Sequence, residues 1–383
     1  MKTTILTTTA EWDARASEWQ QLVDACANPS ITLTWPWLRS WWDVFGNDSR
    51  QLRIVLVHDE DRLVGAAPLL LRRDPRRHYK VLSLRRVELL ASGEERGAPI
   101  CSDYIGWPTV AGYEDAVTEA VLAVLLRELR AEWDEVVLPD MSADAAVTRS
   151  LRERHGTGGV VVTEERREPA AVLDLAPSWD AMLERLGSGL RYKIRRGRRD
   201  FEAQGGTYHA VMAGEPWEHA FETLVGLHQA RWEGKGEPGA FKHPKRLAFH
   251  RLVIPRLLEA GWLRLGVLTM PDGPLGAIYN TRYRGQVFFY QSGIRLTEQT
   301  HLRPGVLLHA YEIEDAIRAG ASEYDFLKRG HSEYKDAWSS RSRDLVRLRV
   351  AQRNIRNWSY EALRAGMAQA RRVKHRLEEA RPR

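Results

Sequence analysis

The sequence predicts an α/β protein of two tandem units, each a mixed, mostly antiparallel sheet flanked by helices. At 383 residues the chain exceeds one typical domain. Strand-like and helix-like segments alternate along it. The segment LRIVLVHDEDRLVGA at 52–66 aligns without gaps to LRLGVLTMPDGPLGA at 263–277, sharing Leu, Arg, Asp, Gly and Ala. These observations favour a duplicated α/β unit over a chance match between two hairpins.

In the first half, period-two and helical patterns define the expected elements in order. They are a strand at 3–8, a helix at 11–26, two strands around a polar turn at 58–62, a helix at 115–133 and a strand at 134–141. Between the first helix and the hairpin, four tryptophans predict an aromatic cluster: Trp35, Trp37, Trp41 and Trp42.

The second half follows a polar region around 140–170 that also holds strand-like stretches at 159–165 and 171–175. Its expected elements are helices at 178–204, 215–233 and 245–260, three strands within 262–294, a helix at 304–319 and a strand from 323. We therefore expect a first domain at 1–165, a second at 166–350 and a helical tail at 351–383.

Several classes of protein are disfavoured by composition. No run of 18 apolar residues is present, and the N-terminal segment lacks the apolar region of a signal peptide. The cysteines, Cys26 and Cys101, form no CxxC motif, and no histidine pair has metal-ligand spacing. We expect a cytoplasmic protein that binds no metal.

The net charge of +6 resides in the tail. Residues 353–383 hold nine Arg and Lys against three Asp and Glu, so the rest of the chain is neutral. Apolar residues at helical spacing predict an amphipathic helix there. It either packs on the body with its arginines in solvent or contacts an anionic membrane or RNA; a neutral body disfavours DNA binding.

Motifs of the second half resemble those of GNAT-related acyltransferases, the family that includes the CelD-like proteins of cellulose biosynthesis. The matching stretches are SGLRYKIRRGRRDFEAQGG, LHQARW, FFYQSGI, RPGVLLHAYEIEDAIRAGASEYDFLKRG and EYKDAW. The chain is similar more distantly to the Fem-type peptidyltransferases, which take amino acids from aminoacyl-tRNA. The resemblance covers about residues 1–345. It implies two GNAT-like units, the first degenerate, and acyl transfer from acyl-CoA or acetyl-CoA in the second.

The donor site is expected between a strand end and a helix start. The GNAT phosphate loop, Q/R-x-x-G-x-G/A, is absent, and TEQTHLRPGVLL occupies its place. A helix N-terminus there offers free N–H groups to an anion. The residues expected to contact the cofactor are Gln291, Ser292, Gly293, Arg303 and Gly305. The alternative is an ordinary helix start.

Three residues are expected to act in catalysis. The resemblance places the strand at DFLKRG across a gap from FFYQSGI. Asp325 is then the first choice for a general base, with Glu333 second. Lys335, in the Tyr-Lys context of the Fem-type enzymes, is expected to stabilise the oxyanion or the leaving group. Tyr290 is expected to protonate the leaving group. Alternatively, Asp325 caps a turn or pairs with Arg329.

Two further segments are expected to bind the acceptor substrate. Arg191 and Arg195 lie on the polar side of a basic helix and suit carboxylate or phosphate, unless they form a solvated face. His228, Arg231 and Trp232 precede a Gly-rich loop that suits a lid, unless it is an ordinary surface loop with Trp232 in the core. Tyr334 completes the expected set.

The predicted function is acyl transfer to an amine or hydroxyl by direct attack, with N-acylation favoured. The acceptor is a small molecule, a glycan or a peptide. Two alternatives remain open: amino-acid transfer from aminoacyl-tRNA, and a non-catalytic role in polysaccharide or envelope assembly. A peripheral contact between the tail and a membrane is also expected.

Overall fold

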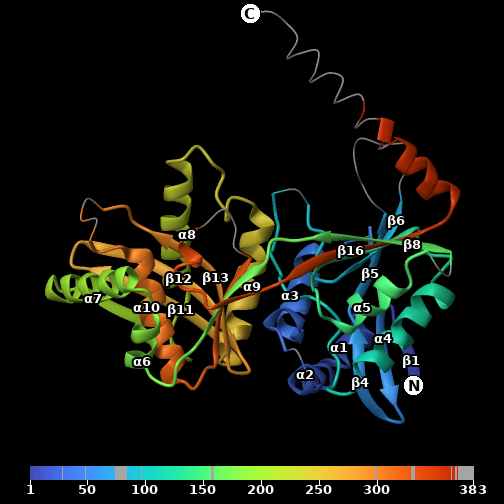
Figure 1. Cartoon of the computed structure of the whole chain (residues 1–383), viewed down its shortest axis with the longest axis horizontal. Helices are drawn as coiled ribbons and strands as arrows, with labels where there is room; N and C mark the ends of the chain where they lie inside the picture. The colour runs from blue at the N-terminus through green and yellow to red at the C-terminus, as the bar shows by residue number, and fades with distance from the viewer. Residues whose placement is uncertain are drawn as a thin grey trace, which may run out of the picture.

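The structure is a computed structural model that describes residues 1–369, except residues 28, 48, 74–83, 96, 157–158, 298, 300, 329–332, 364 and 367–368. Two α/β halves lie side by side, the first half on the right and the second on the left of Figure 1. The first half has two sheets and the second half one, with helices packed on them. The tandem GNAT-like fold class predicted from the sequence is confirmed in this arrangement.

The first half contains two sheets that meet where β4 ends and β5 begins. Its elements are β1 (Lys2–Leu6), α1 (Thr9–Asp13), α2 (Ala16–Ala25), η1 (Ile31–Leu33), α3 (Trp35–Phe45), β2 (Arg50–Leu52), β3 (Ile54–Asp59), β4 (Arg62–Ala67), β5 (Leu69–Arg73), β6 (Arg85–Leu89), α4 (Glu114–Ala123), η2 (Val124–Glu128), β7 (Glu135–Ser142), α5 (Ala146–Glu153) and β8 (Val160–Arg166). Only Pro68, which has no N–H to donate, separates β4 from β5. The strand orders are β1-β3-β4 and β2-β5-β6-β7-β16-β8.

The second half has one seven-stranded sheet with the order β10-β11-β12-β13-β14-β9-β15. Its elements are β9 (Ala170–Asp174), α6 (Trp179–Arg185), α7 (Ser188–Ala203), β10 (Thr207–Ala210), α8 (Glu218–Glu233), α9 (Pro244–Glu259), β11 (Leu263–Met270), β12 (Gly273–Tyr283), β13 (Gln286–Ile294), α10 (Pro304–Arg318), β14 (Glu323–Lys328), η3 (Glu333–Lys335) and β15 (Arg341–Arg343). The final strand, β16 (Leu345–Gln352), leaves this half.

The two halves exchange strands. β8 belongs to the first sheet, but β9, which follows it, pairs with β14 and β15 in the second. Conversely β15 belongs to the second sheet, and β16 inserts between β7 and β8 of the first. Figure 1 shows β16 running from the second half into the first, beside β8. The domain boundaries expected at 165 and 350 stay a prediction. In the sheet pairing, residues 345–352 go with the first half, although the sequence interpretation assigned them largely to the second.

The same connection recurs in both halves. β6 and β7 are parallel and joined through α4, just as β13 and β14 are parallel and joined through α10. In both cases the preceding strand is antiparallel. This topology supports duplication, and the aligned segments at 52–66 and 263–277 fall on β3–β4 and β11–β12.

Apolar packing joins the halves. One buried cluster includes residues of both halves, and a second lies within the second half. Trp37 on α3 packs edge-on against Phe249 on α9, with ring centroids 5.0 Å apart, and lies 5.9 Å from Tyr290. The tryptophan cluster expected from the sequence therefore contributes to the contact between the halves, where Trp37 and Trp41 are buried.

Some predicted elements differ from those observed. The helix expected at 178–204 is two helices, α6 and α7, because Leu186 adopts an extended conformation and Gly187 precedes the second helix. The helix expected at 11–26 is likewise divided, and a capping box between Thr8 and Glu11 starts its first part. β16, α5 and β10 were not predicted.

Candidate active site

Pairing between β13 and β14 stops after three residues. Gln286, Val287 and Phe288 pair with Glu323, Tyr324 and Asp325, respectively. Beyond this point β13 continues only along β12 and β14 along β9. β13 also carries a bulge at Tyr290, because Tyr279 pairs with Gln291 and Asn280 with Phe289. Bulges bend a strand and end regular pairing, so backbone groups facing this gap need other partners.

Asp325 is buried at the point where pairing stops. Its carboxylate accepts hydrogen bonds from Tyr104 Oη at 2.7 Å, Arg343 Nη1 at 2.8 Å and the Leu327 amide at 2.6 Å. Burial raises the pKa of Asp325 to about 7, against the opposing effects of Tyr104 and Arg343. Leu327 has a φ of 56°, so Asp325 holds a local bend in the strand. These contacts do not suit the expected role of general base, because both oxygens are engaged and no part of the side chain is exposed.

Lys335 occupies the gap itself. Its Nζ donates to the carbonyl oxygens of Phe326 at 2.7 Å and Lys328 at 2.5 Å, and lies 5.7 Å from the Phe289 ring across the gap. Burial lowers the pKa of Lys335 to about 8, while the charge of Asp103 acts in the opposite direction. The ammonium therefore satisfies carbonyls of β14 near the unpaired part of β13.

A loop of the first half closes the other side of the gap. Asp103 accepts a hydrogen bond from the Lys328 amide at 3.0 Å and forms an ion pair with its ammonium, which also pairs with Asp140 at 2.9 Å. Tyr290 Oη donates to the carbonyl oxygen of Ile100 at 2.6 Å. The polar residues that end β14 are thus in contact with the first half.

Next to Tyr290 lies a buried cation that forms no direct ion pair with a carboxylate of the described residues. Arg246 on α9 is 5% exposed, and its guanidinium lies 5.6 Å from the Phe241 ring and 6.0 Å from the Tyr290 ring. Its Nε has no hydrogen-bond partner in the described part of the chain, nor has either ring nitrogen of buried His250 one turn later. A buried guanidinium without a direct ion pair suits an anionic ligand.

Glu94 and Cys101 belong to the same loop of the first half. Glu94 accepts a hydrogen bond from Trp41 Nε1 at 2.7 Å, and burial raises its pKa to about 7. The neighbouring Glu95 pairs with Lys245 at 3.0 Å, which keeps this loop beside the start of α9. Cys101 is an exposed free thiol. Arg246 interacts electrostatically with both Cys101 and Glu94.

The residues expected to bind the acyl donor form two groups, one on β13 and one at the start of α10. Gly293 packs against α8: an added Cβ would lie 2.6 Å from the Leu224 carbonyl oxygen and 2.7 Å from the His228 amide. The position of a Gly293 side chain is therefore filled by α8 and is not open to a ligand. The Gln291 side chain accepts a hydrogen bond from the amide of partly buried Ser292. Gly305, in the first turn of α10, has open space around the Cβ position. Arg303 is exposed beside it, with a φ of 45°.

The basic helix α7 is partly committed to packing. Gly197 fits against the carbonyl oxygens of His301 and Leu302, just before α10. Arg198 stacks 4.2 Å from the Tyr311 ring and pairs with Glu314 on α10. The two arginines expected to bind substrate, Arg191 and Arg195, are half-buried and exposed, respectively, with no ion pair to the described residues.

The residues expected in a lid lie in two different environments, one buried and one partly exposed. His228 is buried against the Phe241 ring at 5.2 Å, and burial lowers its pKa to about 4, so it lies in the core. Trp232 is 37% exposed, with Lys235 Nζ 5.5 Å from its ring, and Arg231 is half-buried. Gln229 ties the loop to the helix through Pro238 and Phe241.

Tyr334 lies beside the gap, with its ring 5.7 Å from that of His309. The side chain of Glu333, the second choice for a base, lies outside the described residues, as does Arg329. The sequence interpretation missed Asp103, Tyr104, Glu94 and Arg246. Three of these four residues belong to the first half, which was expected to be degenerate. The signal that could have found them is the long segment between β6 and α4, to which no helix or strand was assigned.

Comparisons with known proteins agree with this geometry. Residues 188–336 match the family model described as an acetyltransferase (GNAT) domain. A crystal structure of FemX covers 94% of this chain and 99% of its own, with a TM-score of 0.65 and 12% identity. The structure of a protein of unknown function from Bacteroides thetaiotaomicron has a TM-score of 0.55 and 11% identity, and the match covers 92% of this chain and 100% of that one. No curated protein matches the sequence.

A third solved structure is the C-terminal domain of a putative lysylphosphatidylglycerol synthetase from Agrobacterium fabrum, with a TM-score of 0.51, 10% identity and coverage of 92% of this chain and 96% of that one. At such identities these likenesses concern the fold alone. The more specific CelD-like resemblance stays a prediction. Residues 188–336 are therefore similar to a GNAT acetyltransferase domain, within a fold of two tandem GNAT-like units.

Proposed function

We propose that the protein is an acyltransferase that moves an acyl group from acyl-CoA to an amine. The second half binds the donor, and the first half forms one wall of the site. The observation that carries this proposal is the interrupted pairing of β13 and β14, with the buried Lys335 ammonium at the interruption and the open start of α10 beyond it.

The donor's pyrophosphate is proposed to lie at the N-terminus of α10. The Gly305 amide precedes the first intrahelical donors, and the space around its Cα is open. Exposed Arg303 adds a positive charge beside this helix end. The thioester would then extend along the gap toward Lys335. Ser292 and Gln291 would contact it from β13, whereas Gly293 contributes by letting α8 approach.

In the proposed reaction the acceptor nitrogen attacks the thioester carbonyl carbon directly. The C–N bond forms, the C–S bond breaks, and the thiolate leaves as the thiol after protonation. Lys335 as an ammonium would stabilise the negative charge that develops on the carbonyl oxygen. Tyr290 is the nearby acid, although burial raises its pKa. Glu94, whose pKa of about 7 suits proton transfer near neutrality, replaces Asp325 as the proposed base.

The acceptor would bind between the halves, beside the buried Arg246, whose Nε has no hydrogen-bond partner among the described residues. A carboxylate or phosphate of the acceptor would neutralise this guanidinium. Trp232, Arg231 and Tyr334 would line the entrance. We assign Asp325 a positioning role, because its bonds to Tyr104 and Arg343 hold the bend that precedes Lys335.

Transfer from aminoacyl-tRNA is the second proposal. The similarity to the FemX structure over 94% of the chain favours it, as do Arg191 and Arg195 on α7, which have no ion pair to the described residues. An RNA backbone would use such arginines, and its binding would weaken steeply with salt.

Calorimetric titration of the full chain with CoA and with charged tRNA separates these proposals. Gly305→Trp fills the space at the start of α10 and should lower CoA affinity at least about tenfold. Gly226→Trp is the matched control, because Gly226 also lies on a helix with nothing near its Cβ position. Salt-sensitive binding of tRNA alone would select the second proposal. Binding of neither would refute both and favour a non-catalytic role.

A further inference from the structure

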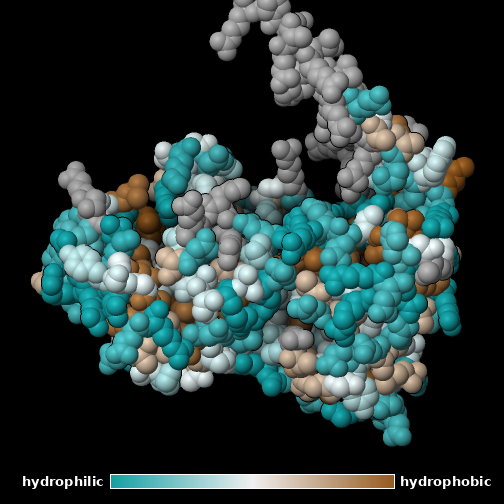
Figure 2. Space-filling model, in the orientation of Figure 1, coloured by the Kyte–Doolittle hydropathy of each residue, from teal (hydrophilic) through white to brown (hydrophobic). Residues whose placement is uncertain are grey.

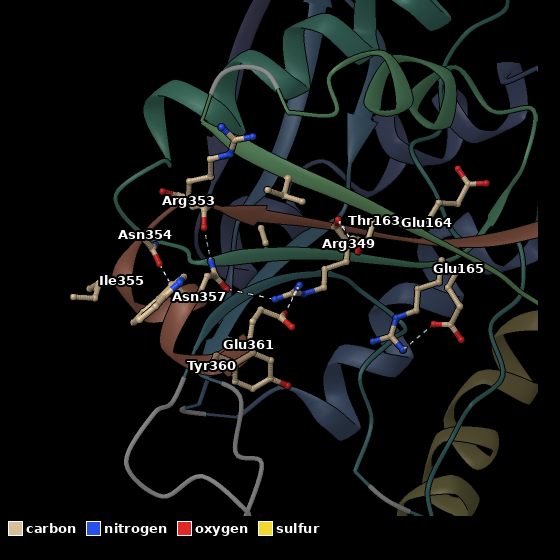
Figure 3. A pocket seen from close by; sticks show the side chains of 15 residues that line it. Thr163, Glu164, Glu165, Arg349, Arg353, Asn354, Ile355, Asn357, Tyr360 and Glu361 are labelled. Atoms are coloured by element: carbon tan, nitrogen blue, oxygen red, sulfur yellow. Dashed lines mark hydrogen bonds and ion pairs between the residues drawn. The ribbon is translucent and has the colours of Figure 1, made fainter. Parts of the chain in front are cut away.

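The short helix formed by residues 355–363, after β16, is docked through one face. Asn357 and Tyr360 are 5% and 3% exposed. Asn357 Nδ2 donates to the carbonyl oxygens of Asp134 at 2.6 Å and Gln352 at 2.9 Å. The helix and the strands β8 and β16 line a hollow of about 1270 Å³, shown in Figure 3. The helix is therefore held in a defined orientation on the first sheet.

The opposite face of this helix is apolar and open to solvent. Ile355 is 78% exposed, Trp358 74% and Leu363 43%. Figure 3 shows Ile355 pointing away from the sheet, whereas Asn357 points toward it. Brown, apolar surface appears on this part of the molecule in Figure 2. An amphipathic helix normally buries its apolar face, so here another surface is expected to cover it.

Charge indicates what that surface is. Arg353 and Arg356 are exposed on either side of Ile355. The sequence from 353 to 383 holds nine basic and three acidic residues, whereas the rest of the chain is neutral. An anionic surface complements this segment, while a second copy would bring like charges together. Trp358 is the one aromatic side chain of this face, whereas proteins that bind single strands stack successive bases on several aromatic side chains. Tryptophan beside basic residues is typical of contact with a lipid interface.

We propose that the face formed by Ile355, Trp358 and Leu363 inserts into the surface of an anionic lipid bilayer, with the surrounding arginines on the headgroups. The protein would then be attached peripherally, with the first half toward the membrane. No helix in the described part of the chain has the length and apolar character needed to cross a bilayer. This inference is independent of the acyl-transfer proposal.

Flotation of the full-length protein with vesicles tests the inference. Vesicles of phosphatidylcholine with one quarter phosphatidylglycerol should bind the protein, and pure phosphatidylcholine vesicles should bind it at least about tenfold less. Trp358→Ala should weaken binding about tenfold with an unchanged melting temperature, because the side chain touches solvent. Leu296→Ala, at a residue 76% exposed in the second half, is the control and should bind like the wild type.

Three results would overturn the inference. The first is equal binding by wild type and Trp358→Ala to anionic vesicles. The second is a dimer, seen by light scattering, that Trp358→Ala disperses. The third is tighter binding to a mixed-sequence RNA oligonucleotide than to anionic vesicles, measured by fluorescence anisotropy under the same salt conditions.

Discussion

Replacing Lys335 by methionine separates the catalytic from the structural role of this residue. The change keeps most of the apolar stem and removes the ammonium that donates to the Phe326 and Lys328 carbonyl oxygens. If the proposal holds, loss of this group should lower kcat by about 10²–10³. The KM for the donor should change little, because α10 and β13 remain intact.

The effect on stability follows from two opposing terms. Leaving two carbonyl groups without a donor costs about 1–3 kcal/mol each, or roughly 2–6 kcal/mol. Removing the buried charge offsets part of this cost. Burial lowers the pKa of Lys335 from 10.5 to about 8, which corresponds to a penalty of about 3 kcal/mol in the wild-type free energy of unfolding at neutral pH. We expect a net destabilisation between about −1 and 3 kcal/mol, so any fall in Tm should stay below about 10 °C.

The pH dependence gives an independent readout. An ammonium that stabilises the oxyanion predicts that wild-type kcat falls as pH rises through about 8, and that Lys335→Met lacks this limb. The folded pKa lies below the unfolded value of 10.5, so the unfolded state binds more protons between about pH 8 and 10.5. Wild-type stability relative to the variant should therefore rise over that window.

The assay follows release of the CoA thiol with a chromogenic disulfide, well below the melting temperature of each protein. Lys242→Met, at an exposed lysine of the same half, is the control and should retain wild-type kcat. A Lys335→Met protein with wild-type kcat and an unchanged pH profile would refute the catalytic role. A lower Tm alone would show that Lys335 only holds the strand end.

Three further predictions concern the fold around the site. Gly293→Ala should destabilise the protein by more than about 2 kcal/mol in urea unfolding, because the new methyl group would lie 2.6 Å from the Leu224 carbonyl oxygen; wild-type stability would contradict this packing. A chain ending at Asp344 lacks β16 and should be insoluble, whereas one ending at Gly366 should be monodisperse by size-exclusion chromatography; equal solubility would show that β16 is dispensable. The pKa of Asp325 is raised from 3.8 to about 7 in the folded state, so the folded state binds more protons than the unfolded state between these pH values. The Tm of the wild type relative to that of Asp325→Asn should therefore fall as pH rises from about 4 to 7. A Tm difference that stays constant over this range would contradict the pKa shift.

The fold class could be predicted from the amino-acid sequence alone. Hydrophobic periodicity is a local property, so the helices and strands of the second half were recognisable. The similarity of 52–66 to 263–277 revealed the duplication because both segments keep the same pattern of buried residues. Lys335 and Asp325 were proposed as site residues from the polar end of a predicted strand and from the resemblance of the EYKDAW and DFLKRG motifs.

How these residues are used depends on contacts between segments that are distant along the chain. The exchange of β9 and β16 depends on long-range pairing, which no local pattern encodes. Gly293 was assigned to a ligand because its sequence context does not show that α8 packs against it. Asp325 accepts a hydrogen bond from Tyr104, 221 residues away along the chain, in a buried environment that the sequence around it does not show. Burial and hydrogen bonding set the protonation and accessibility of a side chain, and both arise from neighbours that are distant in sequence.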